Sequence, residues 1–129
     1  MAAMFRSPQV VLFSSDVPRA VAFYSRLGFA ETFRVPTEGG PIHVDLALDG
    51  YKLGIASVAS TRDDHGLDPV PHGQRAAVIL WTNDTAAAYA QLIADGARGL
   101  ASPHEWLGRL RIAWVEDPDG NPVQIAQDL

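Results

Sequence analysis

His43 and Asp45 are side chains whose types and spacing could transfer a proton. They lie in the stretch IHVDL, residues 42–46, which alternates apolar and polar residues. This alternation is typical of a β-strand with one covered face, so both side chains share the other face. An imidazole beside a carboxylate could serve as a general base or bind a polar ligand. The alternative is an exposed outer strand on which the two side chains only meet water.

Gln124 raises a similar question, because it is an amide inside the apolar stretch PVQIA. Val123 and Ile125 need a covered face, so alternation turns Gln124 to the opposite one. There it would offer one acceptor and two donors. The preceding DPDG, residues 117–120, has the proline and glycine of a turn that joins two strands.

Three aromatic residues also lie in strand-like runs: Phe13, Trp81 and Trp114. Aromatic walls with a few polar groups suit a flat or cationic organic ligand. The alternative is that these side chains belong to the core. Arg111 could bind an anionic group of a ligand, or be a surface arginine. His104 lies in ASPHEWLG, residues 101–108, which we expect to be a loop that could cover the mouth of a cleft.

Composition narrows the class of function. The chain has 129 residues, and 47% of them are hydrophobic, which is typical of a globular protein. Its formal net charge of −5 argues against nucleic-acid binding, which needs a basic surface. No apolar run is long enough to span a membrane. Residues 1–11 lack the apolar segment of a signal peptide. Because cysteine is absent, we expect no thiolate chemistry and a cytoplasmic location.

An internal repeat supplies the elements that position these residues. Residues 9–28 match residues 77–96, and residues 49–56 match residues 119–126, in the same order. The first copy predicts strands near residues 9–14, 30–35, 42–48 and 52–57. The second copy predicts strands near residues 77–82, 98–101, 109–116 and 122–127. In each copy a helix follows the first strand, capped by Asp16 or Asp84 and ended by Gly28 or Gly96.

The predicted fold class is α+β, with two tandem βαβββ modules in a single domain, residues 1–129. The modules span residues 8–60 and 75–129, and the polar segment 61–74 links them. One helix covers only one face of a four-stranded sheet. We therefore expect the modules to form a half-open, barrel-like sheet around a cleft. Alternation places Phe13 and Trp81 on the uncovered face.

This arrangement resembles the vicinal oxygen chelate superfamily, which includes glyoxalase I, extradiol dioxygenases, fosfomycin-resistance enzymes and bleomycin-resistance proteins. The stretches DVPRAVAFYSRLGF and VEDPDGNPVQI carry the resemblance, which covers nearly the whole chain. It implies a cleft between paired modules, usually in a dimer, so we expect a homodimer.

The resemblance also implies where the metal-using members place their ligands, which are His, Gln or Glu. The repeat assigns these four positions to Gln9, Gly54, Ala77 and Gln124. Gly54 and Ala77 have no ligating side chain, and neutral amides alone are weak ligands. We therefore predict no metal and no other cofactor, with Gln9 and Gln124 as binding groups in the cleft.

We predict a metal-independent small-molecule binding protein, nearest in appearance to the bleomycin-resistance members, that sequesters an aromatic or cationic compound such as an antibiotic. The predicted ligand-binding residues are Gln9, Phe13, His43, Asp45, Trp81, Arg111, Trp114 and Gln124. One alternative is a metal-dependent enzyme of the glyoxalase or dioxygenase kind. Another is a metal-free lyase or isomerase with His43 and Asp45, or Glu116, as general base. The sequence leaves open whether any reaction is catalysed.

Overall fold

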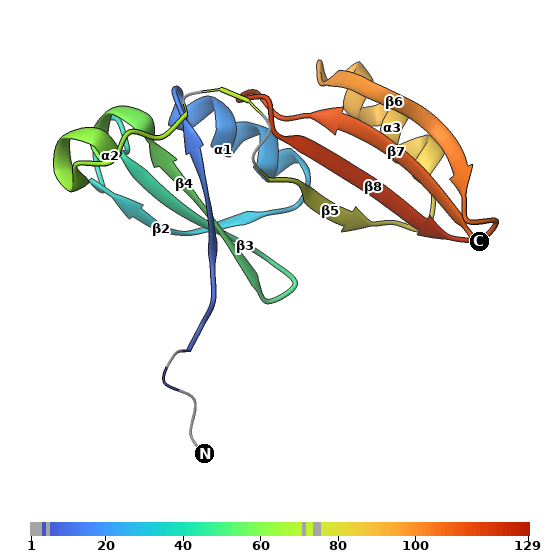
Figure 1. Ribbon diagram of the computed structural model, residues 1–129, viewed down its shortest axis with the longest axis horizontal. Coiled ribbons are helices and arrows are strands. Elements are labelled where there is room, and N and C mark those ends of the chain that lie inside the picture. Colours follow the sequence, from blue (N-terminus) through green and yellow to red (C-terminus); the bar gives the residue numbers. More distant parts are fainter. Residues whose placement is uncertain (1–3, 5, 71, 74–75) are drawn as a thin grey trace. The chain divides into compact units, whose positions relative to one another are not determined.

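The computed structural model describes residues 4, 6–70, 72–73 and 76–129. The chain divides into two compact units, residues 1–71 and 72–129. Each unit contains an open four-stranded sheet with a helix packed against it (Figure 1). The predicted α+β class and the repeated βαβββ order are confirmed. The arrangement of the two sheets around a shared cleft stays a prediction.

The first unit has the sheet order β1-β4-β3-β2. Its elements are β1 (Val10–Ser14), α1 (Val17–Arg26), β2 (Ala30–Val35), β3 (His43–Leu48), β4 (Tyr51–Ser57) and α2 (Val58–His65). Strand β1 runs parallel to β4, and the other pairs are antiparallel. Because β4 lies between β1 and β3, side chains of β1 and β3 can meet only across β4.

The second unit has the equivalent order β5-β8-β7-β6. Its elements are β5 (Val78–Trp81), α3 (Thr85–Ala94), β6 (Arg98–Trp106), β7 (Leu110–Glu116) and β8 (Pro122–Asp128). The strand register confirms the repeat. Val11 lies opposite Gly54 in the first sheet, and Ile79 lies opposite Gln124 in the second.

The two main helices begin and end in the same way. The Oδ1 atom of Asp16 accepts a hydrogen bond from the Arg19 backbone N–H at 3.2 Å, and Asp84 caps α3 in the same manner. Gly28 and Gly96 follow the helices with φ of +106° and +98°, a conformation in which a glycine ends a helix without strain. The predicted caps and stops are confirmed.

The core of each unit lies between its helix and one face of its sheet. Buried residues in the first unit include Leu12, Tyr24, Val44, Leu46 and Ile55, and those in the second include Leu92, Ala113, Val115, Val123 and Ile125. These sheet residues alternate with residues that point the other way. The face of each sheet away from α1 or α3 is therefore its open face.

Two segments differ from the prediction. Residues 58–65 form helix α2, although residues 61–74 were predicted as a linker. Only Val58 and Thr61 of this helix are buried, so its apolar stripe is too short to stand out in the sequence. Strand β6 runs through residues predicted as a loop, up to Trp106. It tolerates Pro103 because it is an edge strand with register shifts.

Candidate functional site

A hydrogen-bonded cluster lies on the open face of the first sheet. Asp45 Oδ1 accepts from Gln9 Nε2 at 2.6 Å and is 2.7 Å from His43 Nε2. An ionised carboxylate only accepts hydrogen bonds, so His43 donates through Nε2. In the neutral imidazole, Nδ1 then keeps its lone pair. His43 and Asp45 therefore share one strand face and contact each other, and their role in binding or proton transfer stays a prediction.

Gly54 makes this cluster possible. It lies on β4 opposite both Val11 on β1 and Asp45 on β3. A Cβ at this position would lie 2.9 Å from Gln9 Nε2, 3.1 Å from Val11 Cγ2 and 3.3 Å from His43 Cε1. Without a side chain at Gly54, Gln9 can reach across β4 to Asp45. Sequence reasoning treated Gly54 only as a missing ligand and did not detect this role.

Aromatic side chains surround the same cluster. The rings of Phe33 and His43 make an edge-type contact, with centroids 6.4 Å apart. Phe33 lies opposite Asp45 on β2, and Phe13 and His43 both lie opposite Ala56 on β4. Both phenylalanines are partly exposed. The sequence analysis did not name Phe33, although its strand alternation could have placed it on this face.

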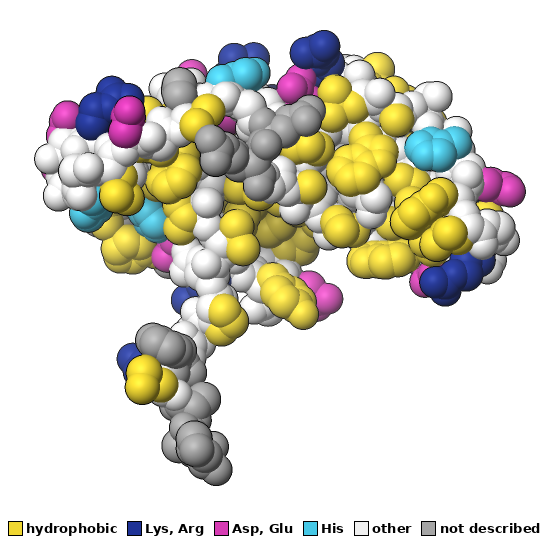
Figure 2. Space-filling model, viewed as in Figure 1, with side chains coloured by type: hydrophobic (Ala, Val, Ile, Leu, Met, Phe, Trp, Pro, Cys, Tyr) yellow, Lys and Arg dark blue, Asp and Glu magenta, His cyan; other side chains and the backbone are white. Residues whose placement is uncertain are grey.

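The open face of the second sheet has no counterpart of the cluster of Gln9, His43 and Asp45 among the residues paired with Gln124. Gln124 lies opposite Ile79 on one side and opposite Trp114 on the other. Val123 and Ile125 are buried, so Gln124 points to the open face of the sheet, as the alternation predicts. Trp81 is 62% exposed and Ile79 is 53% exposed. Figure 2 shows hydrophobic side chains gathered over this sheet.

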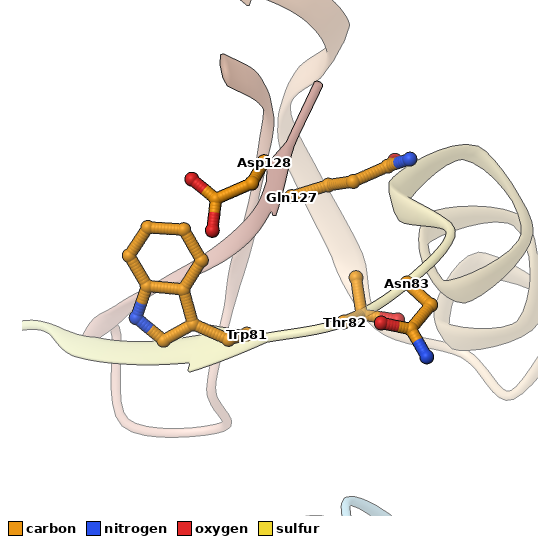
Figure 3. Close-up of a pocket in the computed structure, with 5 residues that line it drawn as sticks. All are labelled: Trp81, Thr82, Asn83, Gln127 and Asp128. Atoms are coloured by element: carbon orange, nitrogen blue, oxygen red, sulfur yellow. The ribbon is translucent and has the colours of Figure 1, made fainter. Parts of the chain in front are cut away.

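A recess of about 530 Å³ lies beside the end of β5. It is lined by Trp81, Thr82, Asn83, Gln127 and Asp128 (Figure 3). The carboxylate of Asp128 points toward the side on which the Trp81 indole lies. Gln127 is tied to the start of α3, since its Oε1 accepts from the Thr85 backbone N–H at 2.9 Å.

Sequence reasoning found Trp81 but not the other residues of this recess. The alternation that turns Gln124 to the open face also turns Asp128 there, so this residue could have been predicted. In the described part of the chain, Asp128 has no ion-pair partner. The recess therefore combines an exposed indole with a carboxylate whose charge is not neutralised by a neighbouring cation.

Two other predicted residues do not line the recess. Arg111 lies opposite Gln127, on the side of the sheet that faces α3, and pairs with Glu105 at 3.4 Å. The structure thus does not bring Arg111 together with Trp114 and Gln124. Glu116, the other predicted general base, is 3.2 Å from Arg98.

Comparison with known proteins identifies the class. Residues 6–125 match the Glyoxalase/Bleomycin resistance protein/Dioxygenase superfamily. The chain belongs to this superfamily, and the predicted resemblance is confirmed. No curated protein matches the chain.

Solved structures show the same fold. The hypothetical protein SA1046 from S. aureus has a TM-score of 0.80 at 16% identity, over 97% of this chain and 95% of that one. TioX from Micromonospora sp. ML1 has a TM-score of 0.75 at 24% identity, over 97% and 100%. TnmS3 from Streptomyces sp. CB03234, described as an antibiotic binding protein, has a TM-score of 0.73 at 24% identity, over all of both chains.

The metal site that the resemblance implies does not fit the residues present. Of its four positions, Gly54 and Ala77 have no ligating side chain. The amide nitrogen of Gln9 already donates to Asp45. In the described parts of the chain, no three His, Cys, Asp or Glu side chains are grouped so that they could hold a metal ion. These positions lack the donors that a catalytic divalent metal needs.

No helix in the described ranges is both long enough and apolar enough to cross a membrane.

Proposed function

We propose that the protein binds an aromatic or cationic organic molecule, such as an antibiotic, without using a metal. The observation that carries this proposal is the exposed indole of Trp81 beside the carboxylate of Asp128 in the recess of the second unit. The cytoplasmic location and the homodimer expected from the sequence remain part of the proposal.

The recess has the chemistry that such a ligand needs. The face of an indole attracts both flat rings and cations. The carboxylate of Asp128 adds a negative charge at the same place. A volume of about 530 Å³ is in the usual range of pockets for small organic ligands.

The fold is compatible with this function. TnmS3, described as an antibiotic binding protein, shares the fold over the full length of both chains. At 24% identity this likeness supports the architecture only. The assignment of a ligand class depends on Trp81 and Asp128.

The test compares two ligands of the same shape and different charge. Benzamidinium and benzamide are both flat, and only the first is a cation. Isothermal titration calorimetry would measure the Kd of each, and of bleomycin as a cationic antibiotic. We expect the protein to bind benzamidinium at least about tenfold more tightly than benzamide, because an opposite charge and an indole face both favour the cation.

Variants locate the binding site. Trp81→Ala and Asp128→Asn should each weaken benzamidinium binding by about fivefold or more. Trp106→Ala is the matched control, because Trp106 is also exposed, at 53%, but does not line the recess. Equal affinities in all these proteins, or no binding of any of the ligands, would contradict the proposal.

A further inference from the structure

We infer that the first sheet carries a second site, in which His43 Nδ1 removes a proton from an apolar organic ligand. This site uses residues of the first unit only, whereas the recess at Trp81 uses residues of the second unit only. The inference therefore goes beyond the proposed binding function and does not depend on it.

The first argument is the direction of the hydrogen bonds. Asp45 can only accept, so the contact at 2.7 Å holds the proton of neutral His43 on Nε2. In the described part of the chain, Nδ1 forms no hydrogen bond. A proton taken up at Nδ1 would leave the ring 2.7 Å from the carboxylate of Asp45, with Nε2 still donating to it.

The second argument is that the carboxylate is held in place from the other side. Gln9 donates to the same Oδ1 atom at 2.6 Å, from a position in which its Nε2 would lie 2.9 Å from a Cβ at residue 54. Gln9 and Asp45 are positioning residues for the His43 ring. An isolated ion pair on a protein surface usually lacks a third residue that holds the carboxylate, as Gln9 does here.

The third argument is access and the nature of the surroundings. The side chain of His43 is 32% exposed and that of Asp45 is 17% exposed, so a ligand can reach the imidazole while the carboxylate is mostly covered. Phe33 and Val35 lie on the adjacent strand β2, and Phe13 lies on β1 across β4; all three are partly exposed. Such surroundings favour an apolar, flat molecule with an acidic hydrogen.

The step itself is simple. The ligand's acidic hydrogen leaves as a proton to His43 Nδ1, and the electron pair of the broken bond stays on the ligand as an anion. The proton returns to the product or to water, so His43 is neutral again. No oxidant or second reactant is needed.

A carbon acid of known chemistry tests this inference. In 5-nitrobenzisoxazole, a base removes the C–H proton, the released electron pair breaks the ring N–O bond, and a coloured cyanophenolate forms. The rate of colour formation at a fixed protein concentration measures how fast the protein removes the proton. Because general bases contribute about 10²- to 10⁴-fold in evolved sites, we expect His43→Gln to be at least about tenfold slower than the unchanged protein with this unoptimised probe.

Further variants separate the acceptor from its positioning residues. Asp45→Asn should lower the rate by about threefold or more, because the carboxylate that holds the proton of neutral His43 on Nε2 is lost. The control is His104→Gln, since His104 Nδ1 is 2.8 Å from the Ser102 carbonyl oxygen; its rate should be unchanged. Circular dichroism melting of each variant establishes that it is folded.

A second measurement does not depend on the probe. Imidazole ¹⁵N NMR reads the tautomer of His43, and we expect the proton on Nε2 in the unchanged protein and a loss of this preference in Asp45→Asn. A His43→Gln variant as fast as the unchanged protein, or a proton on Nδ1, would overturn the inference. Benzamidinium binding should stay intact in His43→Gln, so failure here is distinguishable from failure of the proposed function.

Discussion

The open faces of the two sheets have equivalent backbone positions and different chemistry. In the first sheet, the central row across the strands is Val11, Gly54 and Asp45. In the second sheet, the equivalent row is Ile79, Gln124 and Trp114. A glycine beside a carboxylate in one copy thus corresponds to an amide beside an indole in the other.

This difference gives the two copies of one scaffold different surface chemistry. In the first sheet the missing side chain of Gly54 lets polar groups bond to one another across β4, so their positions are set by directional hydrogen bonds. In the second sheet Trp81 and Ile79 present apolar surface, which is not directional. We infer that the first face suits proton exchange and the second suits binding of flat or cationic groups.

The largest expected effect comes from making the first row resemble the second. Gly54→Gln would place a Cβ within 3.3 Å of three side chains, and crowding of this kind lowers the free energy of unfolding by about 1–3 kcal/mol. Urea denaturation measures this change. The reverse substitution, Gln124→Gly, removes atoms instead and should cost only about 0.5–1 kcal/mol. Equal costs would mean that the two rows are not different in packing.

A double-mutant cycle sharpens the role of Gln9. If its amide occupies the space above Gly54, then Gly54→Ala should be less destabilising when Gln9 is already Ala. Contacting residues commonly couple by about 0.5–3 kcal/mol, and we expect about 0.5–1 kcal/mol here because Gln9 can also swing away. Urea denaturation of the two single variants and the double variant gives the coupling. If the losses in unfolding free energy of the two single variants simply add, a Cβ at residue 54 is crowded by Val11 and His43 and not by Gln9.

Trp81→Ala tests whether the exposed indole on the second sheet contributes to ligand binding rather than to stability. Since 62% of Trp81 is exposed, its truncation should change the free energy of unfolding by no more than about 0.5 kcal/mol, while benzamidinium binding falls. Thermal melting and calorimetry on the same sample check both parts. A large loss of stability would assign Trp81 to the core of the second unit.

The smallest effect concerns an ion pair at the edge of the first sheet. Hydrogen bonding to Arg34, 2.7 Å away, lowers the pKa of Glu31. A lowered pKa means that the pair adds stability above the ordinary Glu pKa and that this contribution disappears as the pH falls through the lowered value. The Glu31→Gln variant should therefore have a slightly lower melting temperature than the unchanged protein at pH 7. Near pH 2 the two melting temperatures should be equal. The same difference at both pH values would contradict this assignment.

Much of the fold could be predicted from the sequence because its signals are local. Asp16 and Asp84 bond to backbone groups three residues away, and Gly28 and Gly96 end helices through their own φ angles. Strand alternation then assigned Gln124, His43 and Asp45 to their faces. Each of these signals is contained within a few consecutive residues, so it can be detected without knowledge of the fold.

Only the tertiary structure decided which distant residues meet. The bond from Gln9 to Asp45 joins the residue before β1 to β3 across β4, next to Gly54 in the strand register. The register of β7 with β8 likewise placed Arg111 opposite Gln127 on the helix side. Register between strands is set by packing of the whole sheet rather than by neighbours along the chain. The repeat, the helix caps and the strand faces were thus determined by the sequence alone, whereas the cluster at His43 and the recess at Trp81 emerged only from the folded sheets.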